Sequence, residues 1–317
     1  MNKSRNIFCL FVCFVLLSIQ GISQDLRIDF ERINSEKAKQ KTNGDYMNYL
    51  EKEVQSLERS YGKTSKEYVY LRGFYLDEYH KIYQPYATLN PISIKEYTEG
   101  RSELVQLCAK VYGDTSVQYA EAIVMHITNF TSLWNGSLSD SSFLNLLYLT
   151  DRAISITFST SLYAQDIKFG YLAMLYSEKG DLFSKIGARD SAIKYYDKVL
   201  EIKKTHPLYD ASFPSFLCKY ANAIDDEDVQ KGLDFLNGYE PIIKEKYFKS
   251  DKEKYFSYLT SIVSHYLRTN YIDKQAISYL LLADTICLNL YGELSKEYVN
   301  YCVDFKLSTF KKMGWKS

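Results

Sequence analysis

The stretch that decides the fold is Tyr291-Gly292-Glu293-Leu294-Ser295-Lys296-Glu297-Tyr298-Val299, because variants of it occur twice more in the chain. The copies are Tyr61-Gly62-Lys63-Thr64-Ser65-Lys66-Glu67-Tyr68-Val69 and Tyr112-Gly113-Asp114-Thr115-Ser116-Val117-Gln118-Tyr119-Ala120. Each copy separates two segments whose apolar residues are spaced three and four apart, as in amphipathic helices. The sequence therefore predicts a protein built from repeated helix–turn–helix units.

The residue types of the motif suit a tight turn between two helices. Glycine adopts the left-handed backbone that closes a helix without steric strain. The serine that follows can accept a backbone N–H as the cap of the next helix. The Glu or Gln beyond it suits the first turn, where free N–H groups favour negative charge. We expect the tyrosines on either side to pack across the turn.

The remaining chain divides into further helices. Residues 24–44 are predicted to form a helical lead-in that stops at Asn43-Gly44, and Asp45 is predicted to cap the next helix. We expect the helix over 229–246 to break at Gly238 and Pro241. First helices of successive units should start near residues 65, 116, 164, 211, 252 and 295. The prediction is an all-α superhelical array of about five to six helix pairs over residues 45–317.

Residues 173–204 resemble a tetratricopeptide (TPR) unit, and residues 276–288 repeat its second-helix pattern. The motif with Tyr-Gly, Ser and Tyr is similar to the longer repeats of the kinesin-light-chain type, found in exported proteins of Bacteroidetes-like bacteria. Val199 stands where the TPR pattern usually has alanine, and Lys204 stands where it usually has proline. The matching small, aromatic and turn positions are Gly180, Phe183, Gly187, Ala192, Tyr196, Ala276, Leu280 and Ala283.

The first residues have the form of a secretory leader. Lys3 and Arg5 precede the apolar run 7–19, and small residues at 21–23 suit cleavage before Gln24. The run is short for a membrane-spanning helix, although a retained anchor is the alternative. We therefore expect residues 1–23 to be a cleavable signal peptide and the protein to be periplasmic or secreted.

Composition limits the classes of partner. The chain has 39 basic and 39 acidic side chains and no basic run, so nothing in it predicts binding to nucleic acid or to an anionic membrane surface. The cysteines beyond the leader are too few for a disulfide scaffold. Cys108 and Cys287 occupy equivalent positions before the motif, which predicts buried sites. Cys287 and Cys302 flank one turn, and a bridge between them stays open.

The sequence holds no arrangement that predicts a reaction. The four histidines are dispersed without metal-ligand spacing, and no cofactor motif is present. Ser191 and Lys194 match the spacing of penicillin-recognising serine enzymes, but they lie within a repeat helix and the companion motif is missing. The acidic run 225–228 lacks the spacing of a calcium loop and is expected to stabilise the start of the next helix.

The TPR resemblance implies a concave groove, lined by first helices, that binds a protein or peptide segment. Aligning the family's groove positions with the two best-matching units gives five candidate partner contacts. The alternative for each residue is an ordinary solvated position on its helix. The expected function is a non-catalytic exported scaffold. The alternatives are a regulatory input domain of a larger or neighbouring signalling protein or effector enzyme, and an enzyme on a helical solenoid. The candidate contacts are Asp181, Ser184, Lys185, His265 and Arg268.

The last unit ends in Lys312-Met313-Gly314-Trp315 without a complete second helix. This leaves two possibilities open. One is a single helix that caps the array, and the other is the front part of a longer protein.

Overall fold

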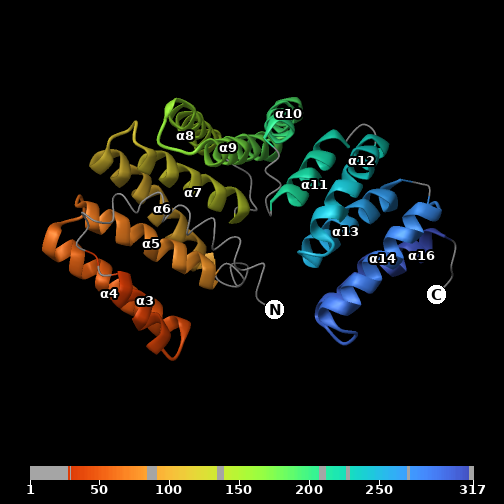
Figure 1. Cartoon of the computed structure of the whole chain (residues 1–317), viewed down its shortest axis with the longest axis horizontal. Coiled ribbons are helices and arrows are strands. Elements are labelled where there is room, and N and C mark those ends of the chain that lie inside the picture. Colours follow the sequence, from red (N-terminus) through yellow and green to blue (C-terminus); the bar gives the residue numbers. More distant parts are fainter. Residues whose placement is uncertain are drawn as a thin grey trace. The chain divides into compact units, whose positions relative to one another are not determined.

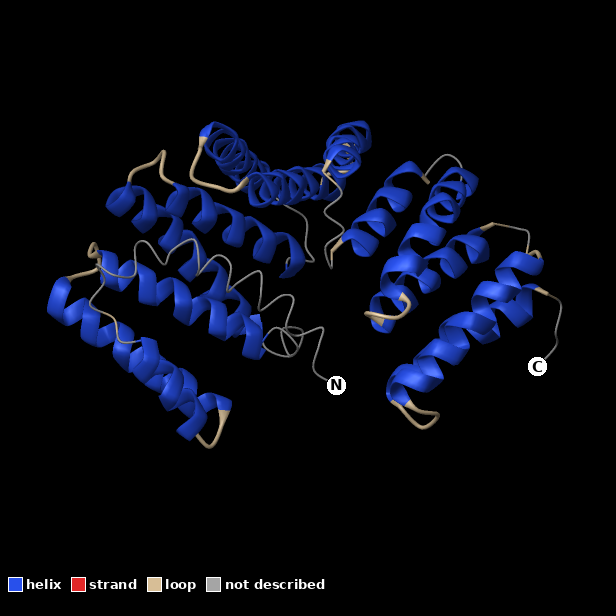
Figure 2. Cartoon of the chain, viewed as in Figure 1, coloured by secondary structure: helices blue, strands red, loops and turns tan. Residues whose placement is uncertain are grey.

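The computed structural model describes residues 28, 30–83, 91–133, 139–206, 212–225, 229–269 and 272–313. Every regular element in these ranges is a helix (Figure 2). The expected signal peptide, the first residues of the lead-in, Asn90, residues 226–228 and Gly314-Trp315 lie outside the described residues. The predicted all-α class is therefore confirmed for the described part of the chain.

The described chain forms two compact units, which are considered separately. One unit contains residues 28–188 with 198–206, and the other contains residues 189–197 with those from 212 onwards. Helix α10 (Arg189–Thr205) contributes its first half to one unit and its second half to the other.

In the N-terminal unit each helix packs against the next one along the chain (Figure 1). Helix α7 also contacts α9, so first helices of neighbouring pairs lie side by side. This is the nearest-neighbour packing of a TPR-like repeat array. The helices are α3 (Phe30–Lys39), α4 (Asn43–Tyr61), α5 (Lys66–Tyr83), α6 (Pro91–Tyr112), α7 (Val117–Leu133), α8 (Asp140–Ser159) and α9 (Gln165–Lys185).

The C-terminal unit repeats the arrangement. Helix α13 contacts α11, α12 and α14, so one neighbouring first helix and two second helices pack around it. The helices are α11 (Phe213–Ile224), α12 (Val229–Tyr247), α13 (Lys252–Arg268), α14 (Lys274–Tyr291), α15 (Lys296–Tyr301) and α16 (Ser308–Lys312), with the π-helical segment η2 (Cys302–Leu307) before α16. The sequence pattern did not predict the π-helical turns.

The three motif glycines end helices in a conformation that only glycine tolerates. Gly62, Gly113 and Gly292 have φ of 79°, 94° and 85°. For Gly62 and Gly292 ψ is 161° and 158°, so they are extended with positive φ rather than left-handed helical as predicted. The positive φ was predicted correctly, and the extended ψ lets the chain leave the first helix before the next one begins.

The three motif serines cap the following helices, as predicted. Ser65 Oγ accepts the N–H of Tyr68 at 3.2 Å, and Ser116 and Ser295 accept from the residues three positions on at 3.1 and 3.0 Å. Each serine hydroxyl also donates to the carbonyl of the motif glycine. One side chain therefore satisfies an amide of the second helix and a carbonyl of the turn.

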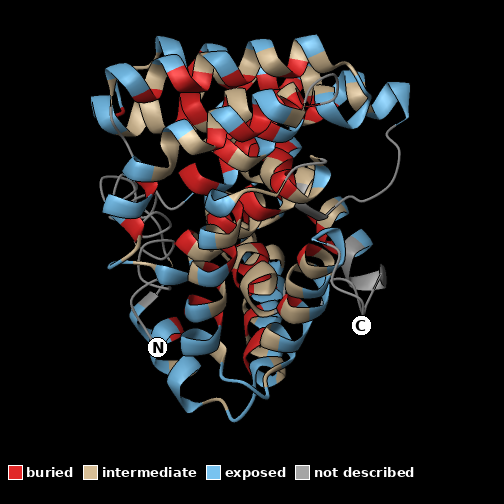
Figure 3. Cartoon of the chain, turned by 90° about the vertical axis from the view of Figure 1, so that its right-hand side faces the viewer, coloured by how far each residue is buried: buried red, intermediate tan, exposed pale blue. Residues whose placement is uncertain are grey.

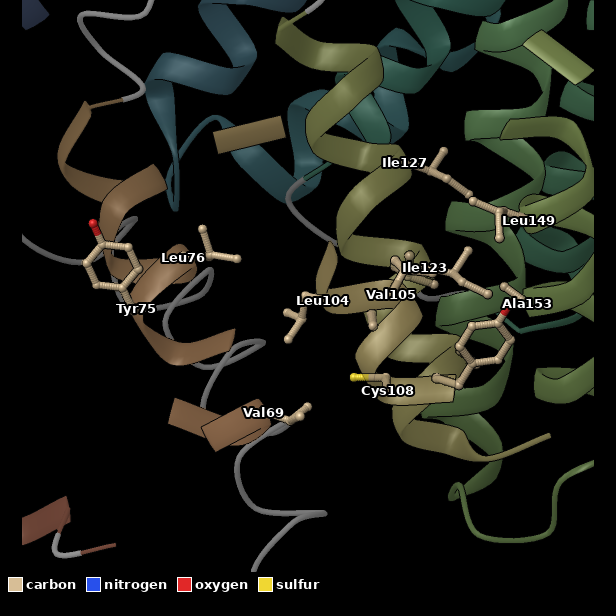
Figure 4. Close-up of a cluster of buried hydrophobic side chains, with 14 of the residues drawn as sticks. Val69, Tyr75, Leu76, Leu104, Val105, Cys108, Ile123, Ile127, Leu149 and Ala153 are labelled. Carbon is tan, nitrogen blue, oxygen red and sulfur yellow. The ribbon is translucent and has the colours of Figure 1, made fainter. Parts of the chain in front are cut away.

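Helix contacts are filled by large apolar side chains. Figure 4 shows part of the N-terminal unit's core, where Leu76 of α5, Cys108 of α6, Ile123 of α7 and Leu149 of α8 lie in one cluster. The buried residues lie along the helix sides that face neighbouring helices (Figure 3). The repeat positions predicted to be packed are buried: Ala192, Tyr196, Val199, Ala276, Leu280 and Ala283.

Two predicted boundaries are wrong. Helix α4 begins at Asn43, and its cap is Thr42, whose hydroxyl accepts the Asp45 N–H at 3.1 Å, so Asp45 is not the cap. Helix α12 continues through Gly238 and Pro241. Tyrosines of α13 hold the turn of α12 that precedes Pro241, because Tyr258 donates to the Leu236 carbonyl and Tyr255 to the Glu240 carboxylate.

The cysteines are unbridged thiols among the described residues. Cys108 and Cys287 are buried, as their equivalent positions predicted. Cys287 and Cys302 also remain free, so the bridge that the sequence left open is absent in this structure.

Candidate functional site

Helix α7 exposes a single narrow stripe. Val117, Glu121, Met125 and Thr128 are partly buried and follow one another at intervals of three and four, while nearly all positions between them are fully buried. Such spacing places the four side chains on one side of the helix. This stripe is the surface that α7 can offer to another molecule.

Helices α5 and α9 carry stripes of the same kind. All three helices are first helices of their pairs, and we call the three stripes together the first-helix face. On α5 the partly exposed stripe is Glu67, Tyr70, Phe74, Asp77 and Lys81. On α9 it is Ile167, Gly170, Met174, Ser177 and Asp181.

Glu121 links the three helices electrostatically. Its Oε1 accepts the hydroxyl of Tyr163 at 3.1 Å, and burial together with the Glu121 charge raises the pKa of Tyr70 on α5 and of Tyr171 on α9. Burial raises the pKa of Glu121 itself to about 7. The rings of Tyr163 and Tyr171 have centroids 5.1 Å apart. The centre of the first-helix face is therefore a carboxyl group surrounded by tyrosines.

The neighbouring charges on this side of the unit already have partners. Arg101 of α6 is buried, forms an ion pair with Asp77 and donates from Nε to the hydroxyl of Tyr97 at 2.9 Å. Glu78 pairs with Lys37 and Lys81. These groups hold α3, α5 and α6 together, and their charges are satisfied within the protein.

The C-terminal unit has a smaller and more polar counterpart on α11 and α13. Arg268 on α13 is partly exposed, and its guanidinium donates to Asn222 Oδ1 of α11 at 3.2 Å and pairs with Asp225. The rest of the exposed stripe of α13 consists of short hydroxyl side chains and a lysine. These residues are Lys254, Ser257, Ser261 and Ser264.

His265 is buried, so it does not lie on an exposed helix face as predicted. Its Nδ1 lies 2.8 Å from the Ser261 carbonyl, and its Nε2 lies 3.3 Å from Asp225 Oδ2. Nδ1 carries a proton and donates it to the Ser261 carbonyl, which can only accept. A hydrogen bond between Nε2 and Asp225 Oδ2 therefore requires a second proton on one of these two atoms. Burial lowers the pKa of His265 and raises that of Asp225. His265 therefore joins α11 to α13 instead of facing a partner.

The structure places the other predicted contacts at exposed or partly exposed positions. Asp181 ends the α9 stripe, and Ser184 and Lys185 follow it in the last turn of α9. Arg268 ends the corresponding stripe of α13. The two groups lie in different units, and their role in partner binding stays a prediction.

Sequence reasoning missed Glu121 and Asp225. A lone glutamate in an apolar helix was the available signal for Glu121, because α7 otherwise carries almost no charge. Asp225 was predicted to stabilise the start of α12 as part of an acidic run. It is instead buried at the end of α11, where the Arg268 and His265 side chains reach it.

The described residues show neither a metal centre nor a membrane span. No three or more histidine, cysteine, aspartate or glutamate side chains gather there in a way that could hold a metal ion. Across the same ranges, no helix is both long and apolar enough to cross a bilayer.

Solved structures similar to this chain are TPR-like repeat proteins of the kinesin-light-chain type. A Podosopora anserina protein described as a kinesin light chain with nearly identical TPR-like repeats shares 14% identity over 68% of this chain and 95% of its own, with a TM-score of 0.48. BtubC (BKLC) from P. vanneervenii shares 14% identity over 84% of each chain, with a TM-score of 0.46. No protein-family model matches the sequence, and no curated protein is significantly similar to it.

The assignment of a TPR-like helical array rests on the consecutive helix pairs, the glycine turns and the serine caps of this chain itself.

Proposed function

We propose that this protein is an exported, non-catalytic scaffold that holds a segment of a protein partner on its first helices. The observation that carries the proposal is the stripe on α7, where a largely buried helix leaves the Glu121 and Met125 side chains partly accessible. Stripes on α5 and α9 extend it with aromatic, sulfur-containing and acidic groups. A surface of this mixed kind suits an extended or helical peptide, because aromatic and methionine side chains contribute contact area and polar ones contribute specificity.

The C-terminal unit supplies a second contact region under this proposal. Arg268 presents a guanidinium held by Asp225 and Asn222, so its orientation is fixed before a partner arrives. Preorganised side chains lose less entropy on binding than free ones. The leader at residues 1–23 supports the exported location, which is expected to be the periplasm or the exterior of a bacterium.

Crosslinking in the source cells tests the function. The protein carries a C-terminal tag, is crosslinked, and is purified from the envelope fraction so that bound proteins are identified. We expect one dominant partner, whose recovery falls on Met125→Lys and on Arg268→Glu. Lys244→Glu, an exposed change on α12, serves as the control and should leave recovery unchanged. Equal recovery with all variants, each shown by circular dichroism to be folded, would refute binding on the first helices.

N-terminal sequencing of the same material tests the location. Gln24 is the expected first residue of the mature protein. An intact Met1 in a soluble internal fraction would contradict export.

A further inference from the structure

We propose that Glu121 and the tyrosines around it bind a basic side chain, a lysine or an arginine, of the protein segment that lies on the first-helix face. This inference rests on the proposed function and specifies the chemistry of its ligand. It follows from three features of the Glu121 site: the missing counterion, the aromatic surroundings and the remaining access.

The first feature is that Glu121 has no counterion among the described residues. Its one hydrogen-bond partner is the neutral hydroxyl of Tyr163, and no lysine, arginine or histidine of the described ranges forms an ion pair with it. Two other acids of the same unit differ, because Glu78 is paired with two lysines and Asp77 with Arg101. A carboxylate removed from water without a counterion is costly, and a cation supplied from outside would offset that cost.

The second feature is the aromatic surroundings. Tyr70, Tyr163 and Tyr171 approach Glu121 from α5, from the segment before α9 and from α9 itself. Aromatic rings attract ammonium and guanidinium groups through their negative faces, and the attraction strengthens when the site excludes water. A carboxylate among tyrosines therefore favours an organic cation over an anion or a neutral group.

The third feature is access. Glu121 remains partly exposed and lies between Val117 and Met125 on the α7 stripe, so a side chain of a segment crossing α7 can reach it. Methionine next to the carboxylate can pack against the aliphatic part of a lysine or arginine side chain. A bare metal ion fits less well, because no second acidic or histidine ligand joins Glu121 in the described residues.

Binding of a cation would be coupled to the release of a proton from Glu121. Glu121 has a pKa of about 7, whereas burial raises the pKa of Tyr70 and of Cys108 to about 12. Burial also raises the pKa values of Tyr163 and Tyr171, which face Glu121 as well. Glu121 is thus the group of this cluster that titrates near neutral pH. A bound cation favours its ionised form, so binding at pH 7 should release a proton.

Peptide selection tests the inference. Random linear peptides are displayed on phage and selected on the purified full chain and on Glu121→Gln. Gln keeps the size of the side chain and removes its charge. We expect the wild-type protein to select peptides that share a lysine or arginine at one aligned position, and Glu121→Gln to lose that preference. The control is Glu99→Gln, which changes an exposed carboxylate on α6.

Calorimetry with one selected peptide then measures the contact. Glu121→Gln should weaken binding about tenfold or more, and so should replacement of the peptide's lysine by norleucine, while the two changes together should cost little more than either alone. Repeating the titration in two buffers of different ionisation enthalpy should show proton release for the wild type and none for Glu121→Gln. Equal affinity of the wild-type protein and Glu121→Gln would overturn the inference.

The selection separates the two proposals. Peptides that bind the wild-type protein without a common basic position overturn the basic-side-chain site and leave the scaffold function standing. Failure of both proteins to select any peptide overturns the scaffold function, and the inference falls with it. Melting curves of both proteins show that each is folded in either case.

Discussion

Asp225 Oδ2 lies 3.3 Å from His265 Nε2, and both side chains are almost completely buried between α11 and α13. The contact joins the end of one first helix to the last turn of the next. Arg268 adds its guanidinium to the same carboxyl oxygen. One acid therefore connects two repeats, and its removal should weaken the C-terminal unit.

We expect Asp225→Ala to destabilise the protein by about 3 kcal/mol, because it leaves His265 Nε2 buried without a partner and releases Arg268. Urea unfolding followed by circular dichroism measures the change. Asp234→Ala, which removes an exposed acid on α12, should change stability by less than about 0.5 kcal/mol. If both variants unfolded at the same urea concentration, the contacts of Asp225 would contribute nothing to the free energy of unfolding.

Two glycines of α12 should respond in opposite directions to alanine. A Cβ at Gly232 would lie 2.7 Å from Asp225 Oδ1 and 2.9 Å from the Ala221 carbonyl, so Gly232→Ala should be strongly destabilising. At Gly238 a Cβ meets nothing within 4 Å, so Gly238→Ala should stabilise the helix by up to about 1 kcal/mol. Thermal melts of the two variants measure both effects. A stabilising Gly232→Ala would contradict the close approach of α11 and α12.

The motif glycines should be intolerant of any side chain. With φ of 79° and ψ of 161°, Gly62 has a backbone that alanine adopts only at a cost of about 1–3 kcal/mol, although space for a Cβ is available. Gly62→Ala should therefore lower the melting temperature. Gly44→Ala, in the first turn of α4 with ordinary contacts, is the matched control and should be neutral or stabilising. Similar melting temperatures for both variants would show that the turn does not need its positive φ.

Glu121 should make stability fall as pH rises. Its pKa is raised from 4.5 to about 7, so the folded protein binds a proton more tightly than the unfolded chain. The protonated form is favoured at low pH, and stability is lost as pH rises from about 4.5 through 7, by a total on the order of 3 kcal/mol. The difference in stability between Glu121→Gln and wild type, measured by urea unfolding across this range, should grow with pH in favour of the variant. A constant difference would show that Glu121 has the same pKa in the folded and the unfolded protein.

Two histidines affect the pH dependence of stability in the opposite direction to Glu121. Burial lowers the pKa of His80 and His126 to about 4. Their contribution is complete above their ordinary pKa near 6.5 and is lost as pH falls towards 4. His126→Gln should therefore reduce the acid sensitivity of wild-type stability between pH 6.5 and 4. Unchanged acid sensitivity in urea unfolding would contradict a buried neutral His126.

The sequence alone determined the repeat architecture and its turns, because these depend on local chemistry. Gly62, Gly113 and Gly292 must end helices, and Ser65, Ser116 and Ser295 can cap the next ones, whatever the rest of the chain does. The spacing of apolar residues likewise determined most helix positions.

Tertiary structure decided the features that depend on neighbouring helices. Helix α12 runs through Pro241 because buried tyrosines of α13 hold it, and no local signal encodes that support. His265 is buried because α11 brings Asp225 to it. Glu121 is the centre of the first-helix face because Tyr70, Tyr163 and Tyr171 come from separate parts of the chain. The periodicity of one helix shows which of its sides is polar, but burial, charge pairing and pKa depend on which helices pack against that side.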